Sequence, residues 1–293
     1  MKFIREASDL HLDWDVRRFN STRIVDTTKP AIREEMDMCW FPPSMDDDMD
    51  TTFIVAGDIW DESRFASRQW QDGSHDTWIV RLSRRFKYVV MVLGNHDYWG
   101  RNVLYEAMKI KEAIKLQGLT NVFLLEKDVS VLDQVKFVGG TLWTDFNRHD
   151  PMVMHNAPAI MNDYKYMRYG RDYRRCRPSD LYEIFMNTKA FIFENAKRDY
   201  PEQKLVVVTH MAPSYESISE SYRTNRDYQM NFLYFSDLDK RIMADGQEID
   251  YWFHGHMHHS TSYHIGNVNV ILNARGYSNY DNPNFDDKLQ IAV

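Results

Sequence analysis

Residues 88–100 read YVVMVLGNHDYWG. The run from Tyr88 to Leu93 is short, apolar and rich in β-branched residues, which is typical of a buried strand. Gly94 and three polar residues, Asn95, His96 and Asp97, follow it at once. Side chains of these types bind metal ions or transfer protons. The rest of the chain must therefore show whether this strand end belongs to a larger site.

Short apolar runs elsewhere predict seven further strands, at residues 3–7, 52–56, 122–125, 135–138, 205–208, 251–253 and 268–272. A 3.6-residue periodicity predicts a helix over residues 103–116, with Gly118 as its C-terminal cap. Two more helices are predicted at residues 179–198 and 236–246. Strands that alternate with helices indicate an α/β fold, in which ligands gather beyond the carboxyl ends of the strands.

The whole chain, residues 1–293, is expected to form one domain, because it contains neither an internal repeat nor a flexible linker. Polar stretches at about 15–50 and 144–178 show no clear periodicity. We interpret them as loops that decorate one core, with residues 144–178 forming an insertion. The acidic run at residues 46–50 is interpreted as a solvated loop.

The composition excludes several classes of protein. A formal net charge of -7 argues against a strongly basic nucleic-acid binder. No apolar run approaches the ~18 residues of a membrane span, and no secretory signal is expected. The two cysteines, Cys39 and Cys176, lie far apart, so we expect a reduced, cytoplasmic protein without a disulfide framework. The oligomeric state stays open.

Four other predicted strands also end in side chains that can bind a metal ion. In chain order these residues are Asp9 and His11 after the first strand, Asp58 after the second, His210, and the pair His256 and His258. Carboxylate, imidazole and amide ligands without cysteine suit divalent Mn, Fe, Zn or Ni. Side chains two residues apart on an extended segment share a face, so each pair can converge on a metal. Gly57, Gly94 and Gly255 are expected to let the backbone turn sharply beside the ions.

This ordered set, Asp-x-His, Gly-Asp, Gly-Asn-His-Asp, His and Gly-His-x-His, resembles the calcineurin-like metallophosphoesterase superfamily, in a bacterial or phage-type form. Each motif alone is weak, but together they span residues 9–258, which is most of the chain. The resemblance implies a four-layer α/β/β/α sandwich of two mixed β-sheets flanked by helices.

The resemblance also implies a role for each motif residue. One divalent ion would be held by Asp9, His11, Asp58 and His258. A second ion would be held by Asp58, Asn95, His210 and His256, with Asp58 bridging the two. His96 would protonate the leaving oxygen or stabilise the phosphoryl charge, oriented by Asp97, while a hydroxide bridging the metals attacks phosphorus in line. A looser likeness in the stretch Asn273–Tyr277 implies that Arg275 contacts the substrate phosphate.

The predicted function is therefore a dinuclear-metal-dependent phosphoesterase acting on a small or nucleotide-like phosphomonoester or phosphodiester. Residues 164–177 combine six basic residues with four tyrosines, which suits a nucleotide or nucleic acid; an ordinary surface segment is the alternative. A metal-dependent binding scaffold on the same fold is a second candidate, although binding alone would not need a proton donor such as His96. A nuclease is a third, although only 35 residues follow His258, which leaves little room for a DNA-binding extension.

Overall fold

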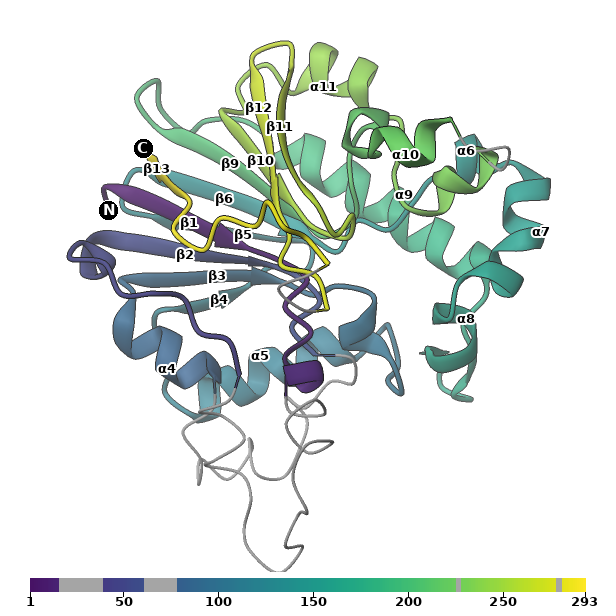
Figure 1. Ribbon diagram of the computed structural model, residues 1–293, viewed down its shortest axis with the longest axis horizontal. Coiled ribbons are helices and arrows are strands. Elements are labelled where there is room, and N and C mark those ends of the chain that lie inside the picture. Colours follow the sequence, from purple (N-terminus) through teal and green to yellow (C-terminus); the bar gives the residue numbers. More distant parts are fainter. Residues whose placement is uncertain (16–38, 61–77, 225–227, 278–280) are drawn as a thin grey trace, which may run out of the picture.

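The computed structural model describes residues 1–15, 39–60, 78–224, 228–277 and 281–293. These residues form two β-sheets that pack face to face, with helices on the outer side of each (Figure 1). The arrangement confirms the predicted four-layer α/β sandwich of two mixed sheets. Most of the polar stretch predicted at about 15–50 lies outside the described residues.

The first sheet has the strand order β13-β1-β2-β3-β4. Its strands are β1 (Phe3–Ala7), β2 (Thr51–Ala56), β3 (Tyr88–Val92), β4 (Val122–Leu124) and β13 (Gln290–Ala292). The first four run parallel, and β13 is antiparallel to β1. Every residue of β2 is buried, as the continuous apolar run of a central parallel strand predicts.

The second sheet has the order β11-β12-β10-β9-β6-β5. Its strands are β5 (Asp128–Leu132), β6 (Val135–Gly140), β9 (Lys204–Thr209), β10 (Tyr251–His254), β11 (Ser260–Ile265) and β12 (Val268–Asn273). The inner four are parallel, while β5 and β11 are antiparallel edge strands. All eight predicted strands are confirmed. In these two sheets the strands missed were β5, β11 and β13, whose partly exposed residues form no apolar run.

The core between the sheets is made of aliphatic and aromatic side chains from both. Ile54 and Val90 of the first sheet pack with Val206 and Phe253 of the second, and all four are fully buried. Burial of one such side chain stabilises the fold by roughly 1.5–3 kcal/mol. This packing holds the two sheets together and fixes the edge at which their parallel strands end.

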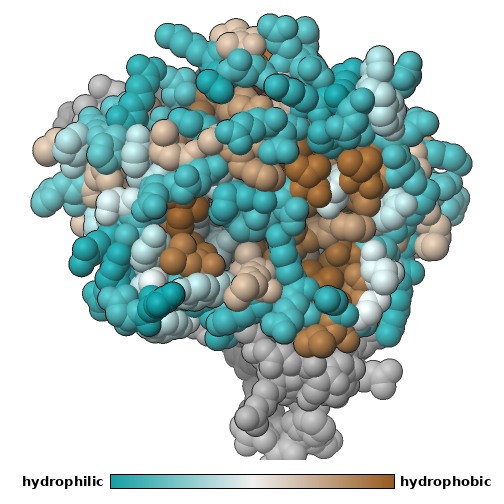
Figure 2. Space-filling model, turned by 180° about the vertical axis from the view of Figure 1, so that it is seen from behind, coloured by the Kyte–Doolittle hydropathy of each residue, from teal (hydrophilic) through white to brown (hydrophobic). Residues whose placement is uncertain are grey.

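Among the described residues, four helices cover the outer faces: α4 (Trp78–Arg85) and α5 (Glu106–Leu116) lie on the first sheet, and α9 (Pro178–Asn195) and α11 (Asp239–Asp245) on the second (Figure 1). Three of them match the predicted helices within about three residues, and α4 was not predicted. The Asp180 carboxylate caps the start of α9 by accepting the Arg177 backbone N–H at 2.8 Å. Seen from behind, the surface is mostly hydrophilic with separate hydrophobic patches (Figure 2).

The segment predicted as an aperiodic insertion is largely helical. It contains α6 (Phe146–His149), α7 (Pro151–Ile160), α8 (Asp163–Tyr166) and a short hairpin of β7 (Arg168–Tyr169) and β8 (Arg174–Arg175). Asp150 caps α7 by accepting the Met152 N–H at 2.8 Å, with Pro151 in the first turn. A second group of short elements precedes β10, namely η4 (Tyr215–Ser217), α10 (Glu220–Arg223) and η5 (Tyr228–Leu233). In the described ranges no helix has the length and apolar content to cross a membrane.

The acidic run at residues 46–50 is not simply a solvated loop, because one of its carboxylates is buried. Asp48, in η1 (Asp48–Asp50), is 5% exposed and accepts hydrogen bonds from Arg5 at 2.8 Å and Arg85 at 2.6 Å. Arg5 lies on β1 and is itself buried. The run therefore supplies the counter-charge for a buried guanidinium, which periodicity could not reveal.

Candidate metal centre and substrate cleft

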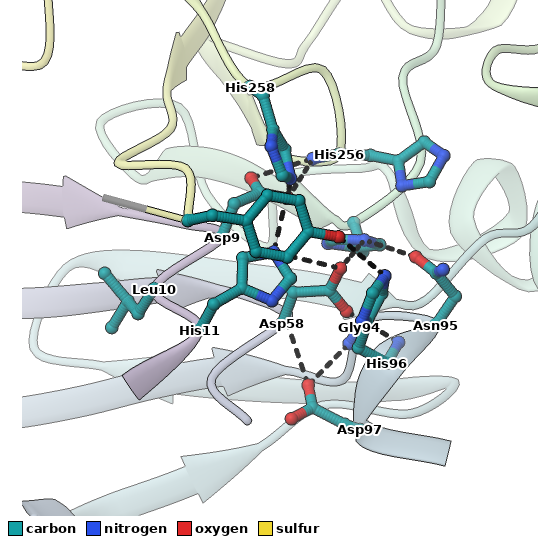
Figure 3. Close-up of polar contacts among 12 residues, drawn as sticks. Asp9, Leu10, His11, Asp58, Gly94, Asn95, His96, Asp97, His256 and His258 are labelled. Atoms are coloured by element: carbon teal, nitrogen blue, oxygen red, sulfur yellow. Dashed lines mark hydrogen bonds and ion pairs between the residues drawn. The ribbon is translucent and has the colours of Figure 1, made fainter. Parts of the chain in front are cut away.

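The seven predicted metal ligands meet at the carboxyl edge of the parallel strands. Figure 3 labels all of them except His210. Six of the seven form two groups, in each of which the ligand atoms lie within 4.8 Å of one another. The first group is Asp9, His11 and His258, and the second is Asp58, His210 and His256. The motifs converge because β1, β2, β9 and β10 end at the same edge. The local sequence of each motif then points its side chain into that edge.

Asp58 belongs to the second group and also approaches the first. Its Oδ2 is 3.3 Å from His210 Nε2 and 4.0 Å from His11 Nε2, and the carboxyl is 1% exposed. Burial acts to raise its pKa, but the positive charges of His210 and His96 outweigh burial and hold the pKa well below its usual value. The carboxyl is therefore ionised and placed where one group could serve two metal ions.

His210 is oriented from behind by the backbone. Its Nδ1 donates to the Ala56 carbonyl at 2.8 Å, which leaves Nε2 facing Asp58 and the Asn95 Oδ1 at 3.0 Å. Burial acts to lower the pKa of His210, but the opposing effect of the Asp58 charge is larger, and the pKa rises to about 9. A ligating histidine needs this type of partner on its second nitrogen, because that partner sets the tautomer that faces the metal.

Asn95 owes its orientation to Asp163, a residue that the sequence motifs did not include. The Asn95 amide donates to Asp163 Oδ1 at 2.9 Å, so its own oxygen faces His210 and the metal centre. Asp163 Oδ1 also accepts the indole N–H of Trp99 at 2.8 Å, and the residue is 3% exposed. Asp163 begins α8, in the segment without periodicity, so no signal in the sequence pointed to it.

The donor set fits divalent metal ions. The His256 Nε2 is buried and has no hydrogen-bond partner among the described residues. Burial of this imidazole, followed by the positive charge of His210, holds its pKa well below the usual value. A neutral imidazole with an unused ring nitrogen, beside the ionised Asp58, is the donor that a cation such as Mn²⁺ or Zn²⁺ requires.

The backbone around the centre is strained. Five of the predicted ligands are non-glycine residues with positive φ angles, namely Asp9 (51°), His11 (42°), Asp58 (53°), His256 (75°) and His258 (49°). Such conformations are uncommon in L residues and gather at functional sites. Of the three glycines predicted to allow sharp turns, Gly57 has a φ of +90°, whereas Gly94 and Gly255 supply space: a Cβ on either would lie within 2.8 Å of a site aspartate.

His96 lies beside the two groups, 8% exposed, and lines the cleft in front of them. Its backbone N–H donates to Asp58 Oδ1 at 2.8 Å, and Trp99 stacks on its ring with centroids 3.7 Å apart. The Tyr277 hydroxyl lies 3.5 Å from His96 Nε2. The imidazole thus contacts two aromatic side chains, and one of its ring nitrogens lies within 4.8 Å of the ligand atoms of His11 and Asp58.

Asp97 lies next to the centre. The sequence predicted that its carboxylate orients the His96 ring, but the hydrogen bonds of this carboxylate go to the backbone. It accepts four backbone N–H groups, from Gly94 and Asp58 at 2.9 Å, Ile59 at 3.2 Å and Trp60 at 3.3 Å. Burial, followed by the charge of Asp58, raises the pKa of Asp97 to about 7. Asp97 therefore ties together the loops that follow β2 and β3.

Arg275 does not contact the cleft as predicted. Its guanidinium, 4% exposed, donates to the Leu10 carbonyl at 2.8 Å and forms an ion pair with Asp15 at 2.7 Å. A guanidinium is drawn to a carboxylate that shares its burial, and the motif likeness could not show that Asp15 lies nearby. Arg275 thus holds the loop after β12 to the loop after β1.

The same C-terminal loop supplies Asp281, a second residue missed by the motifs. Asp281 Oδ2 accepts a hydrogen bond from His258 Nδ1 at 2.7 Å and another from the Tyr277 N–H at 3.0 Å. Burial lowers the pKa of His258, but the bond to Asp281 raises it above the usual value. His258 Nε2 then faces His11 Nε2 at 3.2 Å and Asp9 at 3.6 Å.

The basic segment at residues 164–177 uses several of its charges internally. Arg174 forms two hydrogen bonds with Asp180, at 2.7 and 2.8 Å, and its guanidinium lies 4.8 Å from the Tyr169 ring centroid. Arg168 donates to the carbonyls of Lys165 and Met167. Arginines engaged in this way help the hairpin fold, which favours the structural reading of the segment over nucleic-acid binding.

In front of the ligands lies a cleft of about 500 Å³. Its floor includes the site residues, and its sides come from α7, α8 and the elements between residues 217 and 234. The lining residues other than the metal-site groups are Trp99, Ile160, Met161, Asn162, Asp163, Ile218, Ser219, Tyr222, Met230, Asn231, Tyr234, Met257, Tyr277 and Asp281. A cleft of this size suits an organic ligand larger than phosphate.

Fold and site together define a metal-dependent phosphoesterase. The chain belongs to the calcineurin-like phosphoesterase family, whose family model matches residues 7–260. The family uses divalent metals and acts on phosphate esters.

Individual relatives are distant. An uncharacterized protein, L509, of Acanthamoeba polyphaga mimivirus is 25% identical over 231 residues, which cover 76% of this chain and 79% of that protein. The crystal structure of a phosphopantetheinyl hydrolase from Mycobacterium tuberculosis matches with a TM-score of 0.58 at 17% identity, covering 94% of this chain and 89% of that one. At such identity the structural likeness concerns the fold alone.

Proposed function

We propose that this chain hydrolyses a phosphodiester or phosphomonoester at a centre of two divalent ions, of Mn, Fe, Zn or Ni. The observation that carries the proposal is Asp58, an ionised carboxylate that lies 3.3 Å from His210 of its own group and 4.0 Å from His11 of the other. Bound there, the ions would lower the pKa of a water molecule and draw charge from the phosphoryl group.

The ligands would divide between the ions as the motifs suggest. Asp9, His11 and His258 would serve one ion, and Asn95, His210 and His256 the other, with Asp58 shared. Support comes from the two compact groups, from the unused His256 Nε2, and from the Asn95 oxygen that Asp163 turns inward. Each contact behind these ligands reduces the reorganisation that metal binding would otherwise require.

His96 would act on the leaving group. Its imidazole lines the cleft beside the ligands, within reach of an ester oxygen, and Trp99 and Tyr277 restrict its ring. In that position it would donate a proton to the departing oxygen or stabilise charge on the phosphoryl group. A scaffold that only bound a partner would not need this group.

The test measures metal content and turnover together. Mn-loaded protein is assayed on bis-p-nitrophenyl phosphate and p-nitrophenyl phosphate, with a chelated control, for the wild type, Asp58→Asn and His96→Ala. We expect two ions per wild-type chain and fewer in Asp58→Asn. His96→Ala should keep both ions but lose about 10²–10⁴-fold in turnover.

Each reading can fail separately. Undiminished metal content in Asp58→Asn would refute the shared carboxylate. Unchanged turnover by His96→Ala would refute its role as acid. A preference for the diester would favour a nucleotide or nucleic-acid substrate. If the protein binds two ions but hydrolyses neither ester, the binding scaffold is favoured.

A further inference from the structure

Three aromatic side chains surround the metal centre, and each stacks on one imidazole. Trp99 stacks on His96 with centroids 3.7 Å apart, Tyr277 on His11 at 4.2 Å, and Tyr234 on His256 at 5.4 Å. All three aromatic residues line the cleft. We call Trp99, Tyr234 and Tyr277 the aromatic collar. An ester bound at the metal centre must place its organic group against this collar.

The remaining wall of the cleft is also largely apolar. Most of it is formed by Ile160, Met161, Ile218, Tyr222, Met230 and Met257, and the polar residues Asn162, Ser219 and Asn231 lie among them. Ile160 is 42% exposed and Tyr222 is 62% exposed, so they lie at the mouth, whereas Met161 and Ile218 are buried. Methionine side chains adapt to irregular apolar shapes, so this wall can hold an apolar group without requiring one exact outline.

The charges of the cleft would disfavour a second anion. Asp58, Asp163 and Asp281 line it, and no lysine or arginine does so in the described part of the chain. Arg223, the residue after Tyr222, uses its guanidinium on the Ile218 carbonyl at 2.7 Å and on Glu216. An anionic group beyond the scissile phosphate would lose part of its hydration. Among the described lining residues, no lysine or arginine would compensate for that loss.

We propose that this cleft selects phosphate esters whose organic group is uncharged and apolar, and that it rejects esters carrying a second anionic group there. This inference rests on the proposed function and names its substrate class. The collar would contact the part of the organic group next to phosphorus, and the wall formed with Ile160 and Met230 would contact the part beyond it.

The first experiment varies the organic group while the chemistry of the bond stays constant. Phenyl, 4-butylphenyl and 4-(carboxymethyl)phenyl phosphates, and their methyl diesters, release phenols of nearly equal acidity. Differences in kcat/KM therefore report contacts with the cleft. Because one buried CH₂ contributes about 0.8 kcal/mol, or roughly fourfold, we expect about a tenfold gain for a half-buried butyl group and a loss for the carboxymethyl group.

Binding of stable analogues separates this inference from the proposed function. Benzylphosphonate, 4-butylbenzylphosphonate and 4-(carboxymethyl)benzylphosphonate are titrated into Mn-loaded protein by calorimetry. We expect the butyl compound to bind about tenfold more tightly than the parent, even if no ester is hydrolysed. Binding with that order but without turnover would refute the phosphoesterase and keep the apolar cleft.

A pair of variants on one helix tests the location. Ile160→Lys places a cation at the mouth of the cleft, and Met152→Lys places one on the same helix α7 at a residue that is 63% exposed and does not line the cleft. We expect Ile160→Lys to reduce the butyl preference and to improve the carboxymethyl ligand at least about fivefold. Met152→Lys should match the wild type.

Three results would overturn the inference. They are equal binding of the butyl and carboxymethyl phosphonates by the wild type, equal kcat/KM for the corresponding esters, or the same response in both lysine variants. Thermal unfolding of both variants checks that neither change acts through loss of the fold.

Discussion

Gly94→Ala should disrupt the metal centre by steric contact alone. The φ angle of Gly94 lies outside the left-handed region, so alanine fits its backbone conformation. The added Cβ, however, would lie 2.0 Å from Asp58 Oδ1 and 2.4 Å from the Asp58 backbone nitrogen. Ordinary contact begins near 3.4 Å, so the loop carrying Asp58 must move by about 1 Å.

A displacement of that size at a reacting centre costs about 10²-fold in rate. It would also stretch the hydrogen bond from the His96 N–H to Asp58 Oδ1, which is 2.8 Å long in the native chain. We therefore expect Gly94→Ala to lose about 100-fold in turnover of bis-p-nitrophenyl phosphate. Elemental analysis should show at least one ion lost at limiting metal concentration.

Gly118→Ala provides the matched control. Gly118 has a φ of +67°, and a Cβ there would meet nothing within 4 Å. Its alanine would be strained by about 1–2 kcal/mol, which should lower the melting temperature by a few degrees and leave metal content and turnover unchanged. Full metal content and near-native turnover in a folded Gly94→Ala protein would refute the steric argument, as would equal losses in both variants.

Three further changes test contacts that only the folded chain reveals. Asp48→Ala leaves the buried Arg5 guanidinium without its ion pair and should lower the free energy of unfolding by about 3 kcal/mol in urea titrations. A loss below about 1 kcal/mol would mean that the carbonyls bonded to Arg5 stabilise it without the ion pair. Asp163→Ala frees the Asn95 amide and the Trp99 indole, so the affinity for one metal ion should fall about 10–100-fold in a metal titration. An equal fall in Asp172→Ala, from the same segment, would contradict this positioning role. Burial, with the charge of Asp180, raises the pKa of the Cys176 thiol to about 12. Iodoacetamide at about pH 8 should therefore modify this thiol slowly until the protein unfolds, as followed by mass spectrometry. Rapid labelling of the native protein would contradict the burial of Cys176.

Local sequence was sufficient for the strands and for the ligand motifs. Central parallel strands are buried on both faces, so they form continuous apolar runs that stand out from their surroundings. The edge strands β5, β11 and β13 were not predicted because their residues are partly exposed, so each strand combines polar with apolar side chains instead of forming an apolar run. The same reason explains the missed helices of the insertion, whose apolar residues follow no clear period.

The convergence of Asp9, Asp58 and Asn95 also follows from sequence, because each motif follows a parallel strand and such strands end at one edge of a sheet. Each of these ligands could therefore be predicted from its own motif and the strand that precedes it. His210 follows β9 of the other sheet, so its approach to these residues depends on how the two sheets pack. Long-range partners carried no such signal. Asp281 joins His258 from 23 residues away, and Asp163 joins Asn95 from 68 residues away.

The sequence by itself determined the α/β fold, the order of the motifs and the identity of the candidate ligands. Only the folded chain shows that Asp97 binds backbone N–H groups, that Arg275 pairs with Asp15, and that a cleft with an aromatic collar lies beside the candidate ligands. The physical reason is the range of the interactions. Strand burial and motif geometry act within a few residues, whereas the partner of a buried charge is whichever group the fold brings within hydrogen-bonding distance.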